Sequence, residues 1–160
     1  MRKYLYLFIL LISIFTLCGC GETKKFSTRE VSIEVSSDYQ KFQRDPYIIY
    51  LEDDNSFIGI FKESKDVINS NIIYDFDKVT LEEYINMYCT TNNIGEMDIY
   101  ESDNLTYIEY TITKSTESFF IRVFFFKTNS SFWSAQFCCY ANKKDLYADS
   151  FIEWAKTIDV

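Results

Sequence analysis

Residues 119–126 constrain the fold of this chain more than any other part of its sequence. Successive side chains of a β-strand point to opposite faces of a sheet, and here both alternating sets are apolar except for Arg122. A strand of this kind is stable where both faces of its sheet are covered. We therefore predict a central strand with other elements packed on both sides of it.

The segments on either side predict more strands of the same sheet. Residues 105–113 precede the central segment and residues 132–141 follow it, each across a short polar turn. Long strands joined by such short links form an antiparallel meander. Further β-patterns lie at residues 31–35, 47–52, 57–62 and 97–101, and the polar residues 53–56 predict a hairpin turn.

Two segments have the spacing of helices. Thr80 and Glu83 form a capping box at the start of a helix over residues 81–92. Asn142, with Asp145, is expected to cap a final helix whose apolar stripe ends at Ile158. Residues 63–79 have no convincing period and predict a loop. The element order is β-β-β-α-β-β-β-β-α, an α+β fold with a mostly antiparallel sheet of about six to seven strands and helices packed on it.

The N-terminus has the layout of an export signal. Arg2 and Lys3 precede an uncharged run over residues 5–17, which is short for a spanning helix of about 20 residues. The following Leu17-Cys18-Gly19-Cys20 resembles the lipobox of bacterial lipoproteins. That resemblance implies cleavage after Gly19 and a diacylglyceryl group on Cys20, which anchors stably where a single acyl chain is marginal. The alternative is a buried N-terminal helix or an uncleaved anchor.

These observations predict the domain organisation and the location. Residues 1–19 are expected to be a signal peptide, residues 20–27 the lipidated cysteine with a short tether, and residues 28–160 a single α+β domain. The location implied by the lipobox is the extracytoplasmic side of the bacterial cell membrane. The lipid bilayer is then the first partner, through acylated Cys20.

Composition excludes several classes of function. The chain has no histidine, which removes serine-histidine and cysteine-histidine catalysis and the commonest metal ligand. Loss of residues 1–19 changes the net charge from −8 to −10, because Arg2 and Lys3 leave with the signal. Nucleic-acid binding needs a basic surface, so we expect no nucleic-acid partner.

The cysteines of the domain indicate neither a metal nor a cofactor. Cys89, Cys138 and Cys139 make no CxxC motif and no metal-ligand spacing. An oxidising compartment permits a disulfide from Cys89 to one of the adjacent pair. The interpretation that we favour is three buried thiols, with Cys138 and Cys139 on opposite faces of their strand.

The domain resembles the PsbP and Ran-binding Mog-like group of folds. The resemblance lies in the opening strand 30–35 followed by Tyr39 and Phe42, the helix start at residues 80–84, the three long strands, and the terminal helix around residues 151–154. It implies a fold and a tendency toward protein contacts, with no reaction, because a fold does not settle function.

Two sets of residues are candidates for sites. Arg122 needs a carboxylate, and Glu109 on the preceding strand is its expected partner in a structural ion pair, with anion or ligand capture as the alternative. An outward aromatic set is the candidate partner surface: Tyr100, Tyr107, Phe132 and Tyr140.

The hypothesis that these features favour is a non-catalytic binding or assembly module, anchored at the membrane, whose partner is an envelope protein or component. One alternative is an envelope hydrolase, which needs two converging carboxylates. Another is a carrier of a small hydrophobic ligand, which needs an enclosed cavity between sheet and helix.

Overall fold

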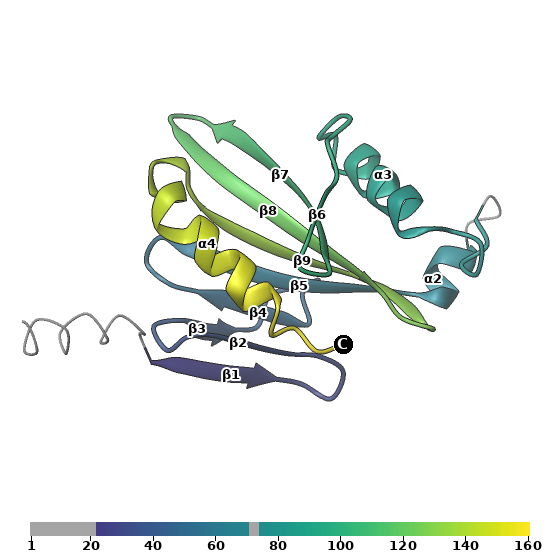
Figure 1. The fold of residues 1–160 in the computed structure, drawn as a ribbon, viewed down its shortest axis with the longest axis horizontal. Helices are drawn as coiled ribbons and strands as arrows, with labels where there is room; N and C mark the ends of the chain where they lie inside the picture. Colours follow the sequence, from purple (N-terminus) through teal and green to yellow (C-terminus); the bar gives the residue numbers. More distant parts are fainter. Residues whose placement is uncertain (1–21, 71–73) are drawn as a thin grey trace, which may run out of the picture.

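The computed structural model describes residues 22–70 and 74–160. The expected signal peptide, with its cleavage site at Gly19 and the lipidation site at Cys20, lies outside these residues. In chain order the described elements are β1 (Thr23–Ser27), β2 (Ser32–Ser36), β3 (Gln40–Phe42), β4 (Ile49–Glu52), β5 (Ser56–Ser64), α2 (Lys65–Ser70), α3 (Leu81–Thr91), β6 (Tyr100–Ser102), β7 (Leu105–Lys114), β8 (Glu117–Lys127), β9 (Ser131–Tyr140), a 3-10 turn (Ala141–Lys143) and α4 (Lys144–Ala155). Figure 1 shows their arrangement.

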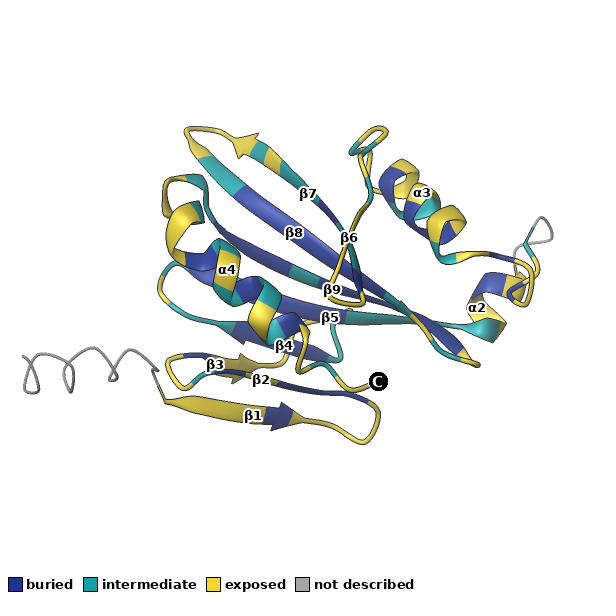
Figure 2. Ribbon diagram, in the orientation of Figure 1, coloured by how far each residue is buried: buried dark blue, intermediate teal, exposed yellow. Residues whose placement is uncertain are grey.

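A seven-stranded antiparallel sheet is the centre of the structure. Its strand order is β3-β4-β5-β9-β8-β7-β6, and β1 and β2 form a separate two-stranded sheet. β8 pairs with β7 on one side and β9 on the other, and its middle is buried (Figure 2). The predicted α+β class, the central strand and the meander are therefore confirmed.

Each face of the large sheet is covered by a different layer. α4 and the β1-β2 sheet pack on one face over a core that includes Ile33, Phe124 and Phe151. α2 and α3 pack on the other over a core that includes Tyr84, Ile121 and Phe132. We call these the α4 face and the α3 face. Because β8 contributes buried side chains to both cores, it needs the two-sided apolar pattern of its sequence.

The two long helices begin in different ways. Thr80 caps α3 as predicted, since its hydroxyl accepts from the Glu83 N–H while the Glu83 carboxylate accepts from the Thr80 N–H. The predicted cap of α4 by Asn142 is wrong, because residues 141–143 form a 3-10 turn and the cap residue is Lys143, without a side-chain hydrogen bond. The turn continues directly into the helix, so the backbone conformation that a side-chain cap requires does not arise at Asn142.

Besides the 3-10 turn, three described elements were not predicted. The tether expected over residues 20–27 is wrong from Thr23 onward, because β1 pairs there with β2 over its whole length. Only Phe26 of β1 is buried, so the strand lacks the alternation that marks a half-buried strand. β3 is wholly exposed, and α2 lies in the segment expected to be a loop.

None of the helices in the described ranges has the length and the apolar character needed to cross a membrane.

Candidate functional site

The strongest candidate site is a cleft of about 320 Å³ on the α3 face. β5 and β9 form its floor, α3 forms one wall, and the segment that leads into β4 forms the other. We call it the tyrosine cleft. Its lining residues are Pro46, Tyr47, Gly59, Phe61, Glu63, Tyr84, Met87, Tyr88, Thr91, Asn92, Ser134 and Gln136.

The absence of a side chain at Gly59 shapes one end of the cleft. The Tyr47 ring lies directly over this position, and a Cβ atom added to Gly59 would stand 2.5 Å from Tyr47 Cε1. The Tyr47 hydroxyl reaches across β5 to the Gln136 Oε1 atom of β9, at 3.4 Å. Gly59 therefore permits a tyrosine to lie flat on the sheet at this point.

The other end is built around a tyrosine-carboxylate pair. The Tyr84 hydroxyl of α3 donates to the Glu63 Oε2 atom of β5 at 2.5 Å. The Tyr84 ring is fixed from behind by stacking on Phe132, with ring centroids 4.3 Å apart and planes at 8°. Among the described residues, Glu63 has no lysine or arginine within ion-pair distance. It therefore brings a negative charge to the cleft that no lysine or arginine of residues 22–70 and 74–160 balances.

The tyrosines of the cleft are neutral at physiological pH. Burial raises the pKa of Tyr84, and its hydrogen bond to the Glu63 carboxylate raises it further. Burial likewise raises the pKa of Tyr88, with a further contribution from Tyr110, and raises the pKa of Tyr47. Since each shift moves away from neutrality, these hydroxyls serve as hydrogen-bonding groups and not as bases.

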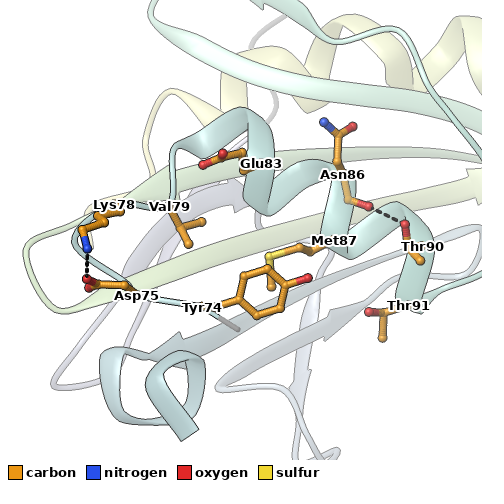
Figure 3. Close-up of a pocket in the computed structure, with 9 residues that line it drawn as sticks. All are labelled: Tyr74, Asp75, Lys78, Val79, Glu83, Asn86, Met87, Thr90 and Thr91. Carbon is orange, nitrogen blue, oxygen red and sulfur yellow. Dashed lines mark hydrogen bonds and ion pairs between the residues drawn. The ribbon is translucent and has the colours of Figure 1, made fainter. Parts of the chain in front are cut away.

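A broader groove adjoins the cleft on the outer side of α3. It has a volume of about 770 Å³ and shares Met87 and Thr91 with the tyrosine cleft. Figure 3 shows Lys78 directed toward Asp75 at one end of this outer groove and Met87 and Thr91 on its α3 side. The Lys78 ammonium lies 3.1 Å from the Asp75 carboxylate, while Glu83 is a second acid on the lining. The two hollows are thus neighbours along α3, with Met87 and Thr91 lining both.

Arg122 and Glu109 lie together on the α4 face. Arg122 Nη2 is 2.6 Å and Nε 3.1 Å from the same oxygen of Glu109, and Nη1 donates to the Ala148 carbonyl of α4 at 2.6 Å. The Arg122 side chain is 9% exposed, and its guanidinium carbon lies 5.1 Å from the centre of the Tyr107 ring. This arginine joins β7, β8 and α4, and its donors are directed at protein acceptors.

The predicted aromatic partner surface is wrong as a set. Tyr100 of β6 and Tyr107 of β7 stack on the α4 face, with ring centroids 5.4 Å apart. Phe132 and Tyr140 of β9 point to the α3 face of the sheet. Phe132 has no exposed surface, because Tyr84 of α3 stacks on it and Phe76 packs beside it. Of the four, only Tyr100 is an exposed large apolar side chain.

The cysteines are free thiols in the described structure. Cys89 and Cys138 lie in the core of the α3 face and Cys139 in that of the α4 face. No group of three or more potential metal ligands occurs within residues 22–70 and 74–160.

Sequence reasoning missed the tyrosine cleft because no local motif marks it. Its residues come from four separated segments, around positions 47, 59–63, 84–92 and 134–136. The available signal was Gly59, a glycine between Phe57-Ile58 and Ile60-Phe61 in β5, because a glycine inside a strand often marks close approach by another group.

This chain is similar to known proteins in its fold. No protein-family model and no curated protein matches the sequence. The solution structure of cyanobacterial PsbP (CyanoP) from Synechocystis sp. PCC 6803 is similar with a TM-score of 0.60 and 9% identity, over 89% of this chain and 95% of that one. A crystal structure from Bacteroides thetaiotaomicron VPI-5482 gives a TM-score of 0.57 and 12% identity, over 86% of this chain and 48% of that one. The chain therefore has a PsbP-like fold.

Proposed function

We propose that this chain is a non-catalytic binding module, held on the extracytoplasmic side of a bacterial membrane by acylated Cys20, and that it engages a protein partner through the tyrosine cleft. The observation that carries the binding role is the cleft itself. It is an open hollow lined by rings, amides and hydroxyls, with Glu63 as its one charged group.

The sequence at the N-terminus supports the anchor. The basic start, the uncharged run and the lipobox together favour export and lipidation. β1 begins at Thr23, close behind Cys20 in sequence, and an extended chain spans about 3.3–3.6 Å per residue. In a lipidated chain, the start of β1 would therefore lie within about 10 Å of Cys20, which keeps the domain close to the headgroups.

The cleft favours binding over the two alternatives. A carboxylate hydrolase needs two acids converging on a substrate, whereas Glu63 is the one acid that lines the cleft. A carrier of a hydrophobic ligand needs an enclosed cavity, whereas the space between sheet and α4 is filled by side chains such as Phe137 and Phe151, both fully buried.

The anchor is tested by metabolic labelling with a radioactive or alkyne-bearing fatty acid. We expect the wild-type chain to be labelled and to sediment with membranes, and Cys20→Ser to lose the label. Cys18→Ser is the matched control, because that cysteine leaves with the signal and its loss should change neither result. Equal labelling of Cys20→Ser and wild type would contradict the anchor.

The binding role is tested by cross-linking in intact cells followed by purification of the full-length chain. Thr91 is exposed on the rim of the cleft, so Thr91→Arg should abolish a specific cross-linked species. Thr116→Arg introduces the same charge in the exposed turn between β7 and β8 and should preserve it. A species unaffected by both changes would show that the cleft is not the contact.

A further inference from the structure

The charge of the tyrosine cleft defines the kind of group that fits it. Its lining contains one carboxylate, from Glu63, and no lysine or arginine. The rest of the lining is aromatic or neutral and polar. A bound anion would meet a like charge, whereas a cation would meet the carboxylate and the negative faces of the rings.

Two arginines of this protein are each bound by a tyrosine ring and a glutamate carboxylate. Arg44 lies with its guanidinium carbon 4.9 Å from the Tyr50 ring centre and with Nη1 3.1 Å from the Glu52 carboxylate. Arg122 lies in the same way over Tyr107 and against Glu109. In both places the ring and the carboxylate stand two residues apart on one strand, and an arginine joins them.

Phe61 and Glu63, two residues apart on β5, both line the tyrosine cleft and repeat this spacing, and no arginine in the described part of the chain joins them. Tyr84 donates to Oε2 of Glu63, and no described side chain donates to Oε1. Rings of Tyr47 and Tyr88 line the same hollow. Because Tyr84 is buried and stacked on Phe132, the carboxylate is held in place before any ligand arrives.

From these contacts we infer that the tyrosine cleft binds one arginine side chain of a partner polypeptide. This inference deepens the proposed binding role and rests on it. The planar guanidinium carries five N–H donors and stacks on aromatic faces, and the cleft offers acceptors at Glu63, Gln136 and Ser134. A lysine ammonium would balance the Glu63 charge, but it is not planar and cannot stack on the aromatic rings. The cleft should therefore prefer arginine.

The size of the hollows indicates that the arginine belongs to a chain. The cleft, at about 320 Å³, is small for a ligand site and suits a side chain. It shares Met87 and Thr91 with the outer groove, which is lined by Asp75 and Glu83. An extended basic segment can therefore lie along α3 with one arginine in the cleft, and the net charge of −8 favours its approach.

The test is a titration of the purified full-length chain in detergent with fluorescent glycine-rich peptides. One peptide carries a single arginine and a second carries citrulline, which has the same shape without the charge. We expect the arginine peptide to bind at least about tenfold more tightly than the citrulline peptide, since a charged hydrogen bond and a ring contact are both lost. A lysine peptide should fall between them.

The same titration with three variants tests whether the arginine peptide binds in the tyrosine cleft. Glu63→Gln keeps an oxygen that can accept from Tyr84, so the fold should survive, and affinity for the arginine peptide should fall about tenfold. Glu101→Gln removes a charge from exposed β6 and should leave affinity unchanged. Thr91→Arg, which places a guanidinium at the mouth of the cleft, should also weaken binding.

Equal affinity for arginine and citrulline peptides, or no effect of Glu63→Gln, would overturn this inference. Failure to detect binding of the arginine peptide would overturn it as well. The proposed binding role would survive these results if cross-linking in cells still depended on Thr91, because that experiment does not assume the charge of the partner.

Discussion

Removing one residue of the Arg122-Glu109 pair should destabilise the fold much more than removing both. Glu109→Leu leaves the Arg122 guanidinium, 9% exposed, without the carboxylate that accepts two of its donors. Removing one partner of a buried ion pair costs about 3–5 kcal/mol. Glu109 is 26% exposed and Arg122 keeps its bond to the Ala148 carbonyl, so we expect about 3 kcal/mol.

The double variant should be nearly as stable as the wild type. Arg122→Met combined with Glu109→Leu replaces both charges with apolar groups of similar length, and such replacements are often neutral or stabilising. The Ala148 carbonyl lies within α4 and can still accept from the backbone four residues on. We therefore expect the double variant to lie within about 1 kcal/mol of wild type.

Urea unfolding followed by circular dichroism measures both variants. With a slope of about 1–3 kcal/mol per molar urea, the single variant should lower the midpoint by about 1–3 M without changing the slope. Asp75→Asn, which breaks an exposed ion pair, should leave the midpoint unchanged. If the double variant lost as much stability as Glu109→Leu alone, the cost of an unpaired buried charge would not be the cause.

Three more perturbations have defined outcomes. Gly59→Ala should cost about 1–3 kcal/mol by overpacking against Tyr47, measured by urea unfolding, and much less when Tyr47→Ala is already present. Thr80→Ala should cost about 1 kcal/mol through loss of the α3 cap, measured in the same way. Burial raises the pKa of Cys138 to about 12 and of Cys139 to about 11 from an ordinary value near 9. Because the unfolded chain then loses these protons first, stability should fall between pH 9 and pH 12, and Cys138→Ala should make that fall less steep.

The parts of the fold that local sequence determines were predictable. The central strand follows from apolar residues on both alternating sets of residues 119–126. The start of α3 follows from the spacing of Thr80 and Glu83, which acts within a single turn. These signals depend on neighbours in sequence, so no knowledge of the tertiary structure was needed.

The parts that depend on tertiary pairing were not predictable. β1 is a mostly polar segment that becomes a strand because β2 is available beside it. Phe132 was predicted to face outward, but nothing in its own segment shows that Tyr84 covers it. The tyrosine cleft combines both difficulties, because Tyr47, Glu63 and Tyr84 are distant in sequence and each resembles an ordinary core or surface residue.

Photo-cross-linking from the rim of the tyrosine cleft tests directly whether the cleft contacts a partner polypeptide. A benzophenone amino acid is placed at Thr91 in the full-length chain and, as a control, at Leu146 of α4, which is 67% exposed on the other side of the sheet. After irradiation of intact cells, the membrane fraction should contain a discrete polypeptide adduct from Thr91 and none from Leu146. Absence of an adduct at Thr91, or the same adducts from both positions, would show that the tyrosine cleft is not the site of contact with a partner.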